Sequence, residues 1–122
     1  EFVDWFLTTV PIEPVWLCPL RLRESTSSAD GWPLYPIRPQ HSYVNVGFWS
    51  SVPVGPEEGY TNRMIERKVS DLEGHKSLYS DAFYSPEEFD ELYGGEVYTT
   101  VKKSYDPDSR FLDLYAKAVR RQ

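Results

Sequence analysis

The stretch that decides the fold is residues 42–50, Ser-Tyr-Val-Asn-Val-Gly-Phe-Trp-Ser, in which apolar and polar side chains alternate. Alternation with a period of two predicts a half-buried β-strand, and Val44, Val46 and Phe48 then form its core face. Upstream, residues 14–22 also read as a strand, because they are rich in Val, Leu and Trp. The two segments predict a small antiparallel sheet.

The opposite face of the strand at 42–50 carries Tyr43, Asn45 and Trp49 around Gly47. A glycine inside a strand leaves room for another group to approach the sheet closely. This face reads equally as one wall of a binding pocket or as a solvent face with two exposed aromatic side chains.

Helical periodicity and helix start signals surround these strands. Ser85-Pro86-Glu87-Glu88 is a strong start, with Ser85 as N-cap and Glu88 closing a capping box. Asp106-Pro107-Asp108 reads as a second start. The predicted helices cover residues 1–10, 59–73, 85–93 and 96–104, and a last one from 106 onward.

Residues 76–81 alternate as a third, short strand, and 23–41 read as a long loop. The order predicts an α+β fold, a small antiparallel sheet with helices packed on it. It resembles a ferredoxin-like βαββαβ unit without its first strand. We expect a partial cap domain over 1–95 and a C-terminal helical tail over 96–122, cut from a longer protein because the chain opens abruptly.

Composition excludes several classes of function. Nineteen acidic and thirteen basic residues give a net charge of −6, which disfavours nucleic-acid binding. The single cysteine, Cys18, permits no internal disulfide, and no stretch has the roughly 20 apolar residues of a membrane helix. We expect a cytoplasmic location, with peripheral membrane association open for a longer parent.

The densest polar and aromatic segment is residues 74–85. His75 can shuttle a proton near neutral pH, and Lys76 can hold an anionic group. Tyr79 and Tyr84 offer ring surface and hydroxyls. The bland alternative is a solvent-facing strand end with tyrosines in the core.

No complete catalytic set accompanies this segment. The glycines lack the spacing of a phosphate-binding loop, and one cysteine with two distant histidines makes no metal site. A nucleophilic pair of Cys18 with His75 is formally possible, and it would make the chain a hydrolase.

Several ordered motifs carry a family resemblance. Residues 14–20, Pro-Val-Trp-Leu-Cys-Pro-Leu, and 78–84, Leu-Tyr-Ser-Asp-Ala-Phe-Tyr, are followed by Glu-Glu-Phe at 87–89 and Tyr-Gly-Gly at 93–95. This series resembles the C-terminal part of the 24-dehydrocholesterol reductase (diminuto-like) family, within the vanillyl-alcohol-oxidase-type flavoproteins. The similarity extends to Tyr98 and Tyr115.

The resemblance implies that the chain is the cap, or substrate, domain of an FAD-linked oxidoreductase whose N-terminal FAD-binding domain lies elsewhere. The parent would move hydride between flavin and an apolar alcohol, sterol or other lipid. His75 and Lys76 would act near the flavin, and Arg110 lies in a tail segment that returns toward the cofactor. Tyr43, Asn45, Trp49, Tyr79 and Tyr84 would line the substrate pocket.

Alone, this chain should bind no FAD and show no activity, and its uncovered apolar surface should favour a homodimer. The alternative from a different class is a non-catalytic, aromatic-rich α+β interaction module.

Overall fold

A two-stranded antiparallel sheet is the β-structure of the described part of the chain. The computed structural model describes residues 1–10, 12–22, 34, 35 and 37–122. Strand β1, Val15–Arg21, pairs with β2, Ser42–Phe48, so that Val15 lies opposite Phe48. Both predicted strands are confirmed. The predicted loop at 23–41 falls largely outside the described residues.

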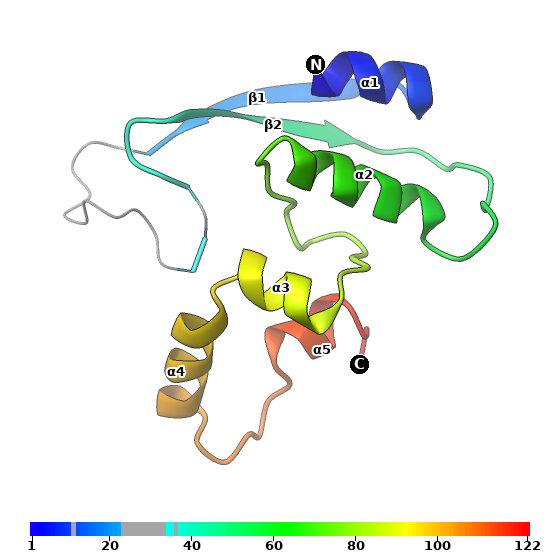
Figure 1. Ribbon diagram of the computed structural model, residues 1–122. Helices are drawn as coiled ribbons and strands as arrows, with labels where there is room; N and C mark the ends of the chain where they lie inside the picture. The colour runs from blue at the N-terminus through cyan, green and yellow to red at the C-terminus, as the bar shows by residue number, and fades with distance from the viewer. Residues whose placement is uncertain (11, 23–33, 36) are drawn as a thin grey trace.

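Five helices complete the described fold, which confirms the α+β class (Figure 1). The helices predicted at 1–10, 59–73, 85–93 and 96–104 are all present within a few residues. None of the described helices is long and apolar enough to cross a membrane. The helices are α1 (Phe2–Thr9), α2 (Tyr60–Asp71), α3 (Pro86–Leu92), α4 (Gly95–Tyr105) and α5 (Leu114–Ala118).

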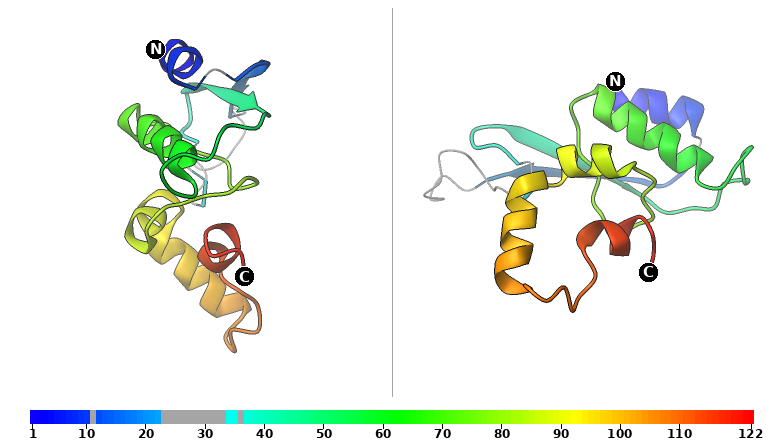
Figure 2. Two further views of the ribbon diagram at one scale, coloured as in Figure 1. Left: turned by 90° about the vertical axis from the view of Figure 1, so that its right-hand side faces the viewer. Right: turned by 60° about the horizontal axis from the view of Figure 1, so that its bottom comes forward.

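Helices α1 and α2 lie side by side on one face of the sheet (Figure 2). Between them and the sheet is a first core of Phe6, Val10, Ile12 and Ile65. The Phe6 ring centre lies 4.4 Å from that of Phe48, so the predicted core face of β2 is covered at this end.

The other end of the same face is not covered. Val44, predicted as core, is 59% exposed, and Leu17 on β1 is 51% exposed. Trp16 and Trp49 are also exposed on the opposite face. A two-stranded sheet has little surface to bury by itself, which explains why apolar side chains remain open on both faces.

A second core joins α3 and α5 to the segment before α3. Its buried members are Ala82, Tyr84, Phe89 and Tyr93. Ser85 caps α3 as predicted: its hydroxyl accepts from the Glu88 backbone N–H at 3.2 Å, and the Glu88 carboxylate accepts from the Ser85 N–H at 2.8 Å. Helix α4 buries none of its residues.

The strand predicted at 76–81 is wrong. This segment is an irregular loop with a turn at 78–80, so the ferredoxin-like third strand is missing from the described residues. Its backbone oxygens bond to side chains instead of a neighbouring strand: Lys76 O accepts from the Tyr93 hydroxyl at 2.7 Å. Alternation in the sequence cannot form a strand when no ladder partner is available.

The last helix begins later than predicted. Asp113, not Asp106, is its N-cap and accepts from the Ala116 N–H at 2.6 Å. The Asp106 carboxylate instead accepts from the backbone N–H groups of Arg110 and Phe111, and from Lys102 Nζ. Phe111 lies in this segment before α5 and is 67% exposed.

The predicted boundary between a partial cap over 1–95 and a tail over 96–122 falls at the first turn of α4. The tail packs back: α5 contributes Leu114 and Tyr115 to the margin of the second core. The division itself stays a prediction.

Candidate functional site

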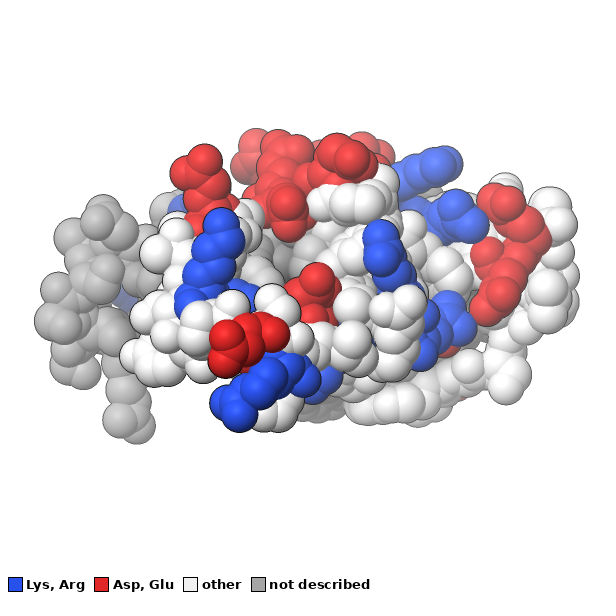
Figure 3. Space-filling view, turned by 90° about the horizontal axis from the view of Figure 1, so that it is seen from below, with Lys and Arg blue, Asp and Glu red and all other residues white. Residues whose placement is uncertain are grey.

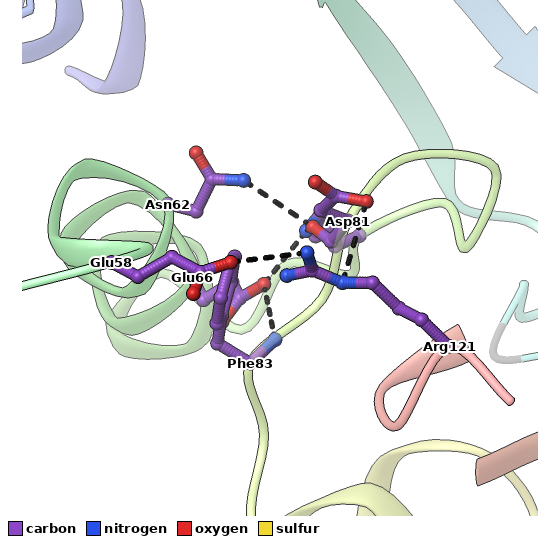
Figure 4. Close-up of polar contacts among 7 residues, drawn as sticks. Glu58, Asn62, Glu66, Asp81, Phe83 and Arg121 are labelled. Atoms are coloured by element: carbon purple, nitrogen blue, oxygen red, sulfur yellow. Dashed lines mark hydrogen bonds and ion pairs between the residues drawn. The ribbon is translucent and has the colours of Figure 1, made fainter. Parts of the chain in front are cut away.

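A buried ion pair joins α2 to the loop at 74–83. Glu66 on α2 is only 3% exposed. Its Oε1 accepts from Lys76 Nζ at 2.7 Å and from the Phe83 N–H at 3.2 Å. We call Glu66, Lys76, Asp81 and Phe83 the polar junction (Figure 4).

The lysine makes two hydrogen bonds in this junction. Lys76 Nζ also donates to the Asp81 carbonyl oxygen, and the Asn62 amide donates to the same oxygen at 3.4 Å. A buried ammonium needs such partners, because desolvation otherwise disfavours its charge. In this arrangement Lys76 holds the loop against α2, and any anion that it binds must compete with Glu66.

Arg121 reaches the junction from the C-terminal residues. Its Nη1 lies 3.2 Å from Glu58 Oε1, and its Nε lies 3.7 Å from Asp81 Oδ1. The guanidinium carbon stands 5.0 Å from the centre of the Phe83 ring. Arg121 thereby connects the C-terminal residues with the segment just before α2 (Figure 4).

His75 points into an aromatic environment. Its ring centre lies 4.4 Å from Tyr93 and 5.5 Å from Tyr35. Nε2 is buried and has no hydrogen-bond partner among the described residues. Burial lowers the pKa of His75 to about 4, so the ring is neutral at pH 7.

Two tyrosines extend this environment into the second core. Burial raises the pKa of Tyr84 to about 12 and the pKa of Tyr93 further still. The two ring centres are 5.8 Å apart. Both hydroxyls therefore stay protonated at neutral pH, and Tyr84 serves the core more than an open pocket.

The other predicted site residues lie apart from this cluster. Tyr43 and Asn45 are half-buried on the face of the sheet away from α1 and α2, and Trp49 follows β2 with 64% of its surface exposed. Tyr79 is 72% exposed on the turn at 78–80. Arg110 is exposed, and its guanidinium stands 5.9 Å from the Phe111 ring.

The close approach predicted at Gly47 is made by the protein itself. A Cβ at this position would lie 2.9 Å from the ring of Trp16, the residue paired with Gly47 across the sheet. The glycine therefore leaves room for the Trp16 ring from the neighbouring strand.

The structure thus brings His75 together with Tyr84 through Tyr93, and turns the neighbouring Lys76 toward Glu66. No direct contact joins the sheet residues Tyr43 and Asn45 to His75 within the described part of the chain. Glu66 and Tyr35 were missed from the sequence. No sequence pattern pointed to the burial of Glu66, since a charged side chain indicates a solvent-facing position.

Neither a metal site nor a nucleophilic pair is assembled. Among the described residues, no group of three or more His, Cys, Asp or Glu is placed to hold a metal ion. Cys18 lies half-buried on β1, where its Sγ faces the Pro19 carbonyl oxygen at 3.9 Å, while His75 contacts Tyr35 and Tyr93. The hydrolase hypothesis gains no geometric support.

Comparison of the chain with protein-family models, curated proteins and solved structures finds no match. The resemblance to the diminuto-like flavoproteins therefore rests on the sequence motifs alone.

Proposed function

We propose that this chain is the substrate-domain part of an FAD-linked oxidoreductase that acts on an apolar alcohol, sterol or other lipid. The observation that carries the proposal is the ordered series of motifs. One motif forms β1, a second forms the loop that contacts α2, and the others form α3 and its link to α4. Residues that resemble one family thus recur in β1 and from the loop before α3 to α5.

The sheet supports the same proposal. Trp16, Leu17 and Val44 leave apolar surface open on both faces of β1 and β2. Such surface favours contact with a further domain or with an apolar ligand. FAD, when bound to the parent, supplies the hydride chemistry, and this chain would bind and orient the substrate.

In this proposal, Tyr43, Asn45 and Trp49 contact the substrate from the sheet, and Tyr79 does so from the turn. His75 and Lys76 would act through the residues around them, because their side chains are held in the aromatic cluster and the polar junction. Arg110 remains the proposed contact to the cofactor. The parent would be cytoplasmic, with peripheral contact to a membrane where its lipid substrate lies.

The test is an absorbance scan of a longer polypeptide that carries this chain after an FAD-binding domain, beside the chain alone. We expect flavin bands in the first and none in the second, and bleaching of the bands by an unsaturated sterol or an apolar alcohol under anaerobic conditions. A longer polypeptide that stays colourless after reconstitution with FAD would contradict the proposal.

A pair of exposed tyrosines tests the substrate site without disturbing the core. Tyr79→Phe should raise KM for the apolar substrate, whereas Tyr105→Phe should not, since Tyr105 is 84% exposed on α4, outside the proposed site. Equal kinetics for both variants would remove Tyr79 from the site.

The interaction-module alternative is favoured by one observation, the exposure of Trp16 and Trp49 on a sheet face that lacks charged side chains. Like the flavoprotein proposal, it predicts a homodimer of the chain alone, and here the dimer should bury both indoles. Light scattering with tryptophan quenching by iodide measures this directly: a monomer with fully quenched tryptophans would contradict it.

A further inference from the structure

The C-terminal residues, the start of α2 and the segment at 82–83 line an open hollow of about 420 Å³. Three arginines line it, Arg63, Arg120 and Arg121, with one acidic side chain, Glu58. The remaining lining is apolar and includes the Phe83 ring. Four of its seven lining residues are therefore charged, so the hollow suits a charged ligand better than an apolar one.

Two of the three guanidinium groups are only weakly engaged. Arg120 stacks over the Tyr115 ring at 5.3 Å and has no ion pair with any described carboxylate. Arg63 Nη2 lies 3.9 Å from Glu57 Oε1, beyond hydrogen-bond distance. Arg63 Nε is buried and has no hydrogen-bond partner among the described residues. Neither guanidinium group is therefore held by a charged hydrogen bond within the described part of the chain.

The third guanidinium is held by groups that can be displaced. Arg121 bonds to Glu58, whose side chain is 81% exposed, and lies near Asp81, whose side chain is 61% exposed. Exposed ion pairs contribute little free energy, because water solvates both groups well. A ligand with more charge than one carboxylate can replace Glu58 on Arg121.

The start of α2 adds to the attraction for an anion. Gly59 caps this helix without a side-chain hydrogen bond, and its first turn contains no acidic residue. The N–H groups of a first turn and the positive end of the helix dipole favour a negative charge. Arg63 lies one turn after Gly59, so the positive end of the helix and the arginines would attract an anion to the same hollow.

We propose that this hollow binds a small phosphate-bearing molecule through Arg63, Arg120 and Arg121. A phosphate carries a charge of about −1.5 to −2 at pH 7 and three strong acceptor oxygens, which suit several guanidinium groups. The organic part of the ligand would lie against Val119 and the Phe83 ring. The site stands apart from the flavin proposal and would exist whichever function the chain has.

The surrounding surface favours a small ligand over an extended polyanion. On the face seen in Figure 3, Lys and Arg side chains alternate with Asp and Glu and form no continuous basic stripe. An extended phosphate backbone would meet repulsion from these acidic groups.

The test is a titration of the whole chain with pyrophosphate at constant ionic strength, followed by nitrogen-15 NMR. We expect saturable shifts of the arginine Nε–H signals and of the backbone amides in the first turn of α2. A response that fails to saturate, or that sodium chloride reproduces, would overturn the site.

Matched variants make the titration specific. Arg120→Gln should weaken pyrophosphate binding by about tenfold, whereas Arg67→Gln, an exposed change on α2 outside the hollow, should leave it unchanged. Glu58→Gln should strengthen binding, because it removes the competing carboxylate. Equal weakening by Arg120→Gln and Arg67→Gln would show attraction by net charge alone and reject the site.

Two further titrants identify the source of the phosphate. If glycerol phosphate competes with pyrophosphate, the ligand is a free solute. If phosphatidic acid vesicles compete and glycerol phosphate fails to compete, the ligand is a lipid headgroup. Either result supports phosphate recognition at the hollow, and competition by neither one rejects it.

Discussion

The two cores of this molecule differ in kind. The first, around Phe6 and Ile65, is aliphatic and aromatic and takes its order from packing against the sheet. The second is rich in tyrosine, and its hydroxyls bond to the backbone: Tyr93 to Lys76 O at 2.7 Å and Tyr115 to Tyr84 O at 3.2 Å. The first core therefore depends on shape, and the second also on hydrogen bonds from tyrosine hydroxyls to backbone oxygens.

The largest expected effects come from truncating one ring in each core. Phe6→Ala and Phe89→Ala, at side chains 0% and 3% exposed, should each lower the free energy of unfolding by about 3–5 kcal/mol. All four tryptophans lie before residue 50, so tryptophan fluorescence in a urea titration reports the first core, and near-ultraviolet tyrosine dichroism reports the second.

This pair of variants decides whether the cores are independent. We expect coincident transitions by both probes, since the polar junction ties α2 to the loop that enters the second core. If Phe89→Ala leaves the urea midpoint of the tryptophan fluorescence transition unchanged, the two cores unfold separately.

The next effect concerns the polar junction between the cores. Lys76→Met leaves the Glu66 carboxylate buried without its cation, and should cost about 3 kcal/mol in urea unfolding. The double variant Glu66→Leu with Lys76→Met should recover most of that loss, because no unpaired charge then remains. If the double variant is as unstable as Lys76→Met alone, the loss of the acceptor for the Phe83 N–H, and not the unpaired charge, accounts for the lost stability.

A smaller effect is a loss of folding stability at low pH, which His75 causes beside the second core. The pKa of His75 falls from 6.5 in the unfolded chain to about 4 in the folded one. The unfolded state therefore binds more protons between these values, and the stability present above pH 6.5 is lost as the pH falls toward 4. Partial exposure limits the loss to about 1–2 kcal/mol.

Equilibrium unfolding at pH 7 and pH 4.5 measures this loss. His75→Phe should reduce it, since phenylalanine keeps a ring between Tyr35 and Tyr93 without a titrating nitrogen. His41→Phe is the control at an exposed ring. A pH dependence unchanged by His75→Phe would assign it to carboxyl groups instead.

The smallest effect is at the edge of the second core. Ser85→Ala removes the capping box of α3 and should cost about 1 kcal/mol. Ser80→Ala, at an exposed position in the preceding turn, is its control. Hydrogen exchange at Glu88 should accelerate only in the first variant, and protection retained there would show that packing of Phe89 alone holds the helix.

These differences also explain what the sequence could predict. Four helices and both strands followed from periodicity and from the cap at Ser85, because local chemistry determines them. The strand prediction at 76–81 was wrong, because a loop can show the same alternation of side chains. In such a loop the backbone carbonyl oxygens accept hydrogen bonds from side chains instead of from a neighbouring strand. Asp106 was mistaken for a cap for a similar reason: an aspartate before proline can close a turn as well as start a helix.

The candidate site was less predictable than the fold. His75 and Lys76 are adjacent in sequence, yet one enters an aromatic cluster and the other an ion pair, and only the packing of α2 and α3 decides this. The burial of Glu66 could not be inferred, because a glutamate beside Ile65 on a helix usually faces water.

The contact between Gly59 and Phe83 has a consequence for sequence variation. A Cβ on Gly59 would lie 2.3 Å from the Phe83 ring, and the backbone at Gly59 has φ +74°. Neither alanine at 59 nor a bulkier ring at 83 can be accepted without moving the other residue. Among natural variants of this chain, glycine should therefore be retained at 59, and a replacement there should need both a residue that tolerates positive φ, such as asparagine, and a small side chain at 83.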